Sequence, residues 1–191
     1  MEAIVRTSKQ KYRQKETKSV YSPCQITKNV VLPMNSIGKN LQQTLEQTIA
    51  KMVEGKCIVE GYVKPRSIKV ITFSSGIVKG ETVIFNVVFN CEVCYPVSGM
   101  RVNCIAKDIT KAGIRAESSD EHPSPFVLYI ARDHYFESDY FNSIEENEKF
   151  VARVIAQRIE LNDKFVSIIA EIVPPEKEFN IPKPKKLNLD F

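Results

Sequence analysis

The sequence predicts an α+β protein in which a helix packs on a small antiparallel sheet and a five-stranded barrel follows. Three observations lead to this fold class. Apolar side chains recur every three or four residues over 37–53, they alternate with polar ones over 83–93, and five short strand patterns follow within 99–173. With 43% hydrophobic and 26% charged residues, a chain of 191 residues can bury a core of this size.

Residues 19–98 are predicted to form the first domain, with an opening strand at 26–33 and one amphipathic helix. Asn35 and Ser36 offer an N-terminal cap for the helix, and Gly55 a C-terminal one. We expect the apolar face of this helix to be core rather than a partner-binding stripe. It consists of Ile37, Leu41, Leu45, Ile49, Met52 and Val53. The strands that complete the sheet are predicted at 57–63, 68–78 and 83–95.

Residues 99–173 are predicted to form the second domain. Strands are expected at 100–109, 114–117 and 126–130, and a hairpin at 149–160 and 164–172 turns around Leu161–Asp163. A short helical or irregular link, 132–143, separates the third strand from the fourth. Five strands in this order are typical of an OB-type barrel, a fold that carries single-stranded nucleic acid on one face.

The two ends of the chain differ in composition from the domains. Residues 1–18 contain six basic and two acidic side chains, so this arm accounts for the whole formal charge of +4. Such an arm either binds phosphates or an acidic partner, or is a solvated, disordered terminus. Residues 174–191 contain Pro174, Pro175, Pro182 and Pro184, and we expect this tail to run extended along a surface.

Composition and motifs argue against several classes of protein. No apolar run is long enough to span a bilayer and no secretory signal opens the chain, so we expect an intracellular protein with reduced cysteines. Cys91 and Cys94 have zinc-like spacing, but residues three apart on a strand point to opposite faces, so no metal or other cofactor is predicted. Arg132–His134 has no nucleophile, phosphate loop or carboxylate cluster to join, so no catalytic residue is predicted.

Several segments, taken together in order, resemble a known family. They are Glu54–Cys57 at the end of the helix, the strand Val83–Tyr95 leading to Pro96, then Gly99–Val102 and Lys111–Ile114. In this order they are similar to the larger stalk subunit of archaeal and eukaryotic RNA polymerases. Tyr129–His134 and Gln157–Asp163 resemble the versions encoded by large nucleocytoplasmic DNA viruses.

The resemblance implies a non-catalytic subunit of a DNA-dependent RNA polymerase. Its first domain would dock on the polymerase core near the clamp to support initiation, and its barrel would contact nascent single-stranded RNA. A viral polymerase of this kind would be found in the virion and the host cytoplasm, and otherwise the protein would be in the nucleus or cytoplasm. Whether a smaller stalk subunit joins it is left open.

The resemblance also suggests site residues. In the family an aromatic residue often follows the glycine of the second barrel strand, whereas Arg115 occupies that position here. We expect weak, sequence-tolerant RNA contact through stacking and charge, by Arg115, Tyr129, Arg132, Arg158 and Lys164. We expect polymerase docking at loops where the backbone can approach closely, around Gly55, Pro65, Gly76 and Gly80. Ordinary surface charges and a half-buried tyrosine are the alternative for the five RNA-contact residues.

Two other functions remain possible from the sequence. A freestanding single-stranded RNA-binding factor in translation or RNA handling would bind RNA on its own with a steep salt dependence. An enzyme with an OB-type accessory domain would need a catalytic group of residues that the sequence does not contain.

Overall fold

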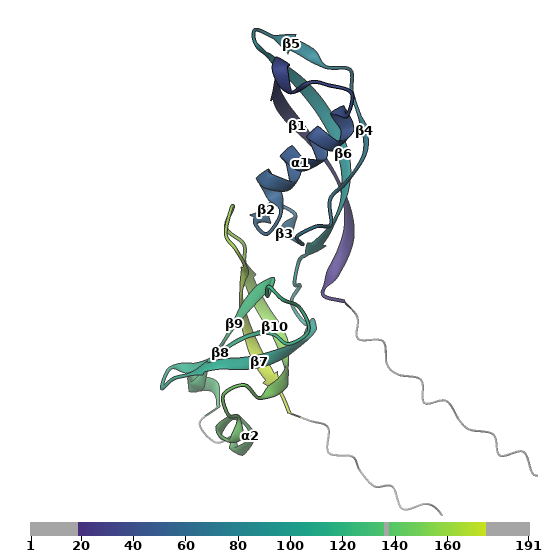
Figure 1. Ribbon diagram of the computed structural model, residues 1–191. Helices are drawn as coiled ribbons and strands as arrows, with labels where there is room; N and C mark the ends of the chain where they lie inside the picture. Colours follow the sequence, from purple (N-terminus) through teal and green to yellow (C-terminus); the bar gives the residue numbers. More distant parts are fainter. Residues whose placement is uncertain (1–18, 136–137, 175–191) are drawn as a thin grey trace, which may run out of the picture.

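The structure, a computed structural model, describes residues 19–135 and 138–174. The molecule is elongated, with a sheet carrying one long helix at one end and a barrel at the other (Figure 1). The predicted arm, 1–18, and nearly all of the predicted tail, 174–191, lie outside the described residues. Within the described part of the chain, no helix is long and apolar enough to cross a membrane.

Two long strands form the centre of the first sheet. β1 (Tyr21–Pro33) and β6 (Thr82–Cys94) pair antiparallel over their whole length of 13 residues. The alternation predicted for this segment accounts for the long strand β6, because every second side chain from Val83 to Val93 is buried against the core. The other edge of β6 pairs with three short strands, and a fourth extends the sheet from β3; these are β3 (Gly61–Val63), β4 (Lys69–Phe73), β5 (Ile77–Lys79) and β2 (Cys57–Ile58).

The helix α1 (Leu41–Val53) is shorter than predicted. The chain makes a 3-10 turn at Met34–Ser36, so Asn35 and Ser36 do not cap the helix and Ile37 precedes it. Gly38 explains the late start, since glycine is costly in a helix interior. Leu45, Ile49 and Val53 are buried as expected, whereas Met52 at the border of the apolar face is 42% exposed.

Two predicted strands of the first half are each divided in the structure. The segment predicted at 57–63 is a tight hairpin of β2 and β3, and Gly61 at its turn has a φ of 126°. The segment predicted at 68–78 is interrupted by Ser74–Gly76, so β4 and β5 are separate. Runs of apolar residues predicted these strands, but the turns within them break the pairing.

The second half is a closed five-stranded barrel with the strand order β10-β11-β9-β8-β7. The prediction of an α+β protein ending in an OB-type barrel is therefore confirmed. All neighbouring pairs are antiparallel except β9 and β11, which are parallel. The strands are β7 (Arg101–Ile109), β8 (Gly113–Ser118), β9 (Phe126–Ala131), β10 (Lys149–Arg158) and β11 (Val166–Val173).

The link between β9 and β10 closes one end of the barrel. It contains a 3-10 turn at Arg132–His134 and the short helix α2 (Asp139–Ser143), and Phe141 from α2 is buried in the barrel core. The Ser138 hydroxyl accepts a hydrogen bond from the Phe141 amide at 3.3 Å and so caps α2.

The sheet and the barrel meet through a shared row of side chains. Cys57, Tyr62, Cys94 and Tyr21 lie opposite one another across β2, β3, β6 and β1, and all four belong to the barrel's hydrophobic cluster. The Cys57 amide also donates to the Asp163 carbonyl at 2.7 Å, and the Asn162 amide donates to the Cys57 carbonyl at 2.9 Å. The β10–β11 turn is thereby bonded to the edge of the sheet.

Candidate nucleic-acid interface

A row of outward-facing residues crosses the barrel and defines the candidate site. From β7 to β10 the strand pairing places Asp108, Arg115, Tyr129, Ile169 and Ala156 opposite one another. Tyr129 is 44% exposed and Ile169 is 56% exposed. The two adjacent side chains form an apolar ridge on an otherwise mixed surface.

Two irregularities in the strands bring this row into register. The pairing of β7 with β8 shifts between Ala106 and Asp108, and that of β10 with β11 shifts between Val154 and Ala156. Each shift leaves one extra residue, Lys107 or Ile155, in its strand. Such β-bulges re-aim the side chains that follow them, and here they place Asp108 opposite Arg115 and Ala156 opposite Ile169.

Tyr129 stands between two hollows. The larger, of about 670 Å³, lies where the small residues Ala112, Gly113 and Ala131 adjoin the ring. A side chain at Gly113 would place its Cβ 2.0 Å from the Ile130 carbonyl oxygen, so this close approach of β8 to β9 requires glycine.

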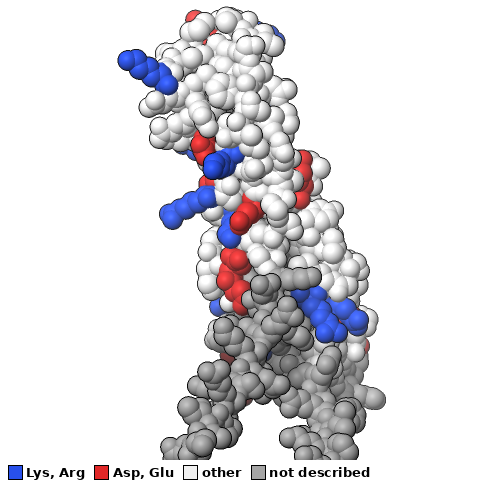
Figure 2. Space-filling model, turned by 90° about the vertical axis from the view of Figure 1, so that its right-hand side faces the viewer, with Lys and Arg blue, Asp and Glu red and all other residues white. Residues whose placement is uncertain are grey.

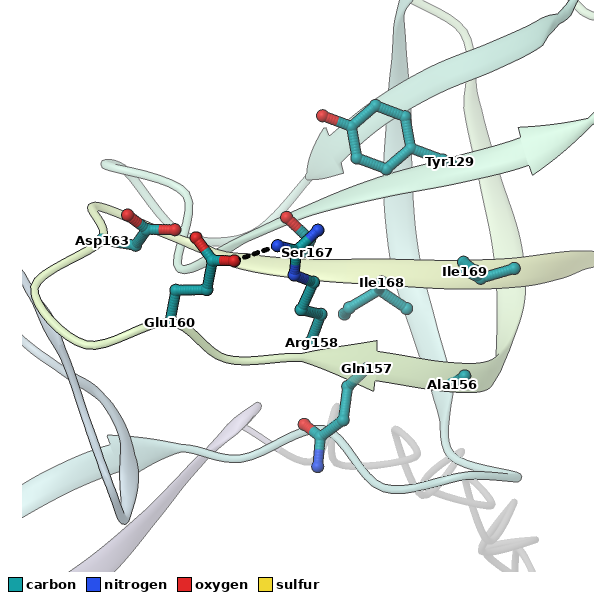
Figure 3. Close-up of a pocket in the computed structure, with 9 residues that line it drawn as sticks. All are labelled: Tyr129, Ala156, Gln157, Arg158, Glu160, Asp163, Ser167, Ile168 and Ile169. Atoms are coloured by element: carbon teal, nitrogen blue, oxygen red, sulfur yellow. Dashed lines mark hydrogen bonds and ion pairs between the residues drawn. The ribbon is translucent and has the colours of Figure 1, made fainter.

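The smaller hollow, of about 400 Å³, lies on the other side of the ring beside the β10–β11 hairpin. Figure 3 shows Tyr129 above β11, with Ser167, Ile168 and Ile169 below it and Arg158 and Glu160 to one side. The lining is therefore apolar at its centre and charged at its rim.

Arg115 and Arg158 are both engaged by carboxylates. The Arg115 guanidinium donates to Asp108 at 2.8 Å and to Glu117 at 3.3 Å. The hydrogen bond to Asp108 is the main reason that the pKa of Arg115 is raised. Arg158 pairs in the same way with Glu160. The two arginines closest to the ridge therefore carry their own counterions.

The other predicted RNA-binding residues lie in different settings. Arg132 donates to the Asn142 side chain at 3.3 Å and to the Thr110 carbonyl at 3.2 Å, and it covers the ring of Phe141. It therefore holds the β9–β10 link against the β7–β8 turn. Lys164 is exposed in the β10–β11 turn, where its neighbour Asp163 lines the smaller hollow. The structure thus places Arg115, Tyr129 and Arg158 along the two hollows and Lys164 in the adjacent turn, whereas Arg132 holds the link in place.

The four predicted docking residues fall into two groups. Gly55 and Pro65 are neighbours near the barrel, since a Cβ at Gly55 would lie 3.9 Å from the Pro65 side chain. Gly76 and Gly80 flank β5 at the far end of the sheet (Figure 1). They therefore do not form a single surface.

The sequence reasoning missed a group of exposed apolar side chains at that far end. It consists of Val31, Met34, Ile77 and Val78, and we call it the end patch; their exposed fractions are 54%, 48%, 69% and 63%. Val31 and Ile77 both lie opposite Ile84 on one face of the sheet, whereas Val78 lies opposite Val83 on the other face. On the face shown in Figure 2 the upper part of the molecule is mostly uncharged, and most acidic and basic side chains lie lower. The consecutive apolar residues Ile77 and Val78 beside Gly76 and Gly80 were the available signal.

Cys91 and Cys94, the two cysteines with zinc-like spacing, lie in different environments. The Cys91 side chain belongs to the core between α1 and the sheet, while Cys94 belongs to the barrel cluster. Over residues 19–135 and 138–174, no group of three or more His, Cys, Asp or Glu residues is arranged to hold a metal ion.

Comparison with known proteins gives one distant relative of interest. The chain is 23% identical over 160 aligned positions to a protein of Acanthamoeba polyphaga mimivirus that is named as a DNA-directed RNA polymerase subunit. The match covers 75% of this chain and 76% of the mimivirus protein. No family model matches the chain.

Proposed function

We propose that this protein is a non-catalytic subunit of a viral DNA-directed RNA polymerase and forms the larger part of its stalk. The observation that carries the proposal is the extent of the similarity to the mimivirus protein, which covers three quarters of both chains. A match of that length is longer than either half of this fold, so it includes parts of both the sheet and the barrel. A shared barrel alone would not produce it.

The end patch is the proposed polymerase-docking surface. Large exposed apolar side chains gathered at one end of a domain favour association with another protein. Val31, Met34, Ile77 and Val78 lie on the two faces of the sheet at the end of the molecule remote from the barrel. Gly76 belongs to this end, because a Cβ there would come within 2.4 Å of the Val83 side chain. Docking near a mobile clamp would favour the closed polymerase only through contacts that differ between its open and closed states.

The ridge is the proposed contact with nascent RNA. Tyr129 offers a stacking surface, and the turns at either end of the ridge carry Lys111 and Lys164. OB-type barrels bind single strands on this face and with these two loops. Because the arginines beside Tyr129 are already paired with carboxylates, the contact would be weak and would depend mainly on stacking. Such a protein would act in the virion and in the cytoplasm of the host.

Affinity purification of the tagged protein from infected cells, followed by mass spectrometry, tests the proposal. Recovery of the large catalytic polymerase subunits at near-equal stoichiometry is the expected result, and it would also reveal any smaller stalk subunit. Recovery of RNA or ribosomal proteins without polymerase would contradict it. That outcome would favour a freestanding single-stranded RNA-binding factor, a role that the exposed Tyr129 also fits.

A further inference from the structure

We propose that the two hollows beside Tyr129 receive unpaired bases, not phosphates, and that Asp108 and Glu160 make this face prefer cytosine to uracil. The inference rests on the proposed contact with RNA and specifies how that contact would discriminate between bases. It concerns the ridge and its rims only and does not depend on the end patch.

The shape of the site favours bases. Tyr129 lines both hollows and is 44% exposed, so its ring can be reached by a planar partner that enters either of them. Volumes of about 400 and 670 Å³ lie in the range of about 300–1,000 Å³ that is usual for small-molecule pockets. Ile169 lines both hollows, Ile168 the smaller one and Ile130 the larger one, and these apolar side chains suit the face of a base and do not suit a charged phosphate.

The charge on the rims also favours bases over phosphates. Carboxylates line both hollows, with Asp108 at the larger one and Glu160 and Asp163 at the smaller one. The arginines among them are held in ion pairs, Arg115 by Asp108 and Arg158 by Glu160. A phosphate approaching either rim therefore meets at least as much negative charge as positive charge. A base edge that carries a hydrogen-bond donor meets an acceptor instead.

Cytosine and uracil differ at the group that a carboxylate would read. Cytosine has an amino group where uracil has a carbonyl oxygen, and Asp or Glu accepts from the cytosine amine. The two bases otherwise match in size and in ring shape, so stacking on Tyr129 would not separate them. Purines with exocyclic amines would also be accepted, but their larger rings change the stacking energy as well.

The test compares the full-length protein's affinity for oligocytidine and oligouridine of about eight nucleotides, a length within the usual site size of such barrels. Fluorescence anisotropy at one salt concentration is expected to give at least about fivefold tighter binding of oligocytidine. In the double variant Asp108→Asn/Glu160→Gln the ratio should fall to about one, because an amide can donate to uracil as well as accept from cytosine. Affinity for oligouridine should not fall, since Arg158 loses its counterion and Arg115 keeps only Glu117.

A matched control removes an exposed carboxylate elsewhere. Glu146 lies between α2 and β10 and lines neither hollow, so Glu146→Gln should leave the ratio unchanged. Equal affinities in the unsubstituted protein, or a preference that survives in the double variant, would overturn the inference while leaving RNA contact intact. If neither oligonucleotide binds, or if Tyr129→Ala does not weaken their binding, the RNA contact itself is overturned.

Discussion

At the scale of single residues, Tyr129 shows how small neighbours make a binding surface. Its ring is exposed because β9 turns this side chain outward, and it borders two hollows whose lining includes the small residues Gly113, Ala131 and Ala156. The sequence allowed Tyr129 to be selected as a candidate. It did not show that Arg115 pairs with Asp108, because that contact depends on an extra residue in β7 for which the sequence has no clear signal.

Replacing Tyr129 should weaken RNA binding without affecting the fold. Stacking of a base on an aromatic ring contributes about 1–3 kcal/mol, so Tyr129→Ala should reduce affinity for a short single-stranded RNA about five- to hundredfold. Tyr129→Phe keeps the ring and should bind nearly as well as the unsubstituted protein. Fluorescence anisotropy measures both. Equal affinity of the alanine variant and the unsubstituted protein would rule out stacking at this position.

Replacing Arg132 should lower the stability of the barrel without weakening RNA binding. Its side chain bonds Asn142 and the Thr110 carbonyl and covers Phe141, so Arg132→Ala should destabilise the barrel by about 1–2 kcal/mol. RNA affinity should be unchanged, because the residue belongs to the link and not to the ridge. Thermal unfolding followed by circular dichroism measures the loss, with the exposed neighbour His134→Ala as the control. A large loss of RNA affinity with unchanged stability would contradict this assignment.

At the scale of elements, periodicity predicted the long strands and failed at their interruptions. β6 and the hairpin of β10 and β11 lie close to the predicted ranges because alternation is regular there. The start of α1 and the division of 57–63 into β2 and β3 depend on local turns at Gly38 and Gly61, which apolar periodicity does not reveal. The closure of the barrel was inferred from strand number and order, whereas its register could only come from the structure.

All three residues of β5 are exposed, so this strand is the part of the end patch that a partner can reach most directly. The double substitution Ile77→Asp/Val78→Asp places charge on the end patch and should strongly reduce copurification of the polymerase. Both side chains are more than 60% exposed, so stability should change little. Val59→Asp is the matched control, since Val59 is 76% exposed but lies on the turn next to the barrel. Loss of polymerase from the Val59 variant alone would move the docking surface to the Gly55 and Pro65 end.

At the scale of the whole molecule, the sheet and the barrel are joined by hydrogen bonds and by a common core. Cys57 takes part in both, through its backbone contacts with Asn162 and Asp163 and through its buried side chain. The sequence suggested two units but gave no indication of this junction, because it joins residues a hundred positions apart.

Buried thiols should make this junction and both cores sensitive to alkaline pH. Burial raises the pKa of Cys57 and Cys91 to about 11 and that of Cys94 and Cys104 to about 12. In the unfolded chain these thiols ionise near pH 8.5. The unfolded state therefore loses protons first, and the stability present below that pH should be lost as the pH rises toward 11 to 12.

Thiolate ultraviolet absorbance checks this directly. Under reducing conditions, the native protein should show little thiolate at about pH 10, whereas the protein in concentrated urea should show nearly complete ionisation. Identical titration curves in the two states would mean that these four thiols are not shielded from water in the folded protein.

Site-specific photo-cross-linking in purified, transcribing complexes can test both ends of the molecule in a single measurement. A photoreactive amino acid would replace Ile77 in one sample and Tyr129 in another. The proposed stalk role predicts that position 77 cross-links to a large polymerase subunit and that position 129 cross-links to the nascent transcript. Cross-links from both positions to ribosomal or other RNA-handling proteins, with no polymerase subunit among the products, would contradict it.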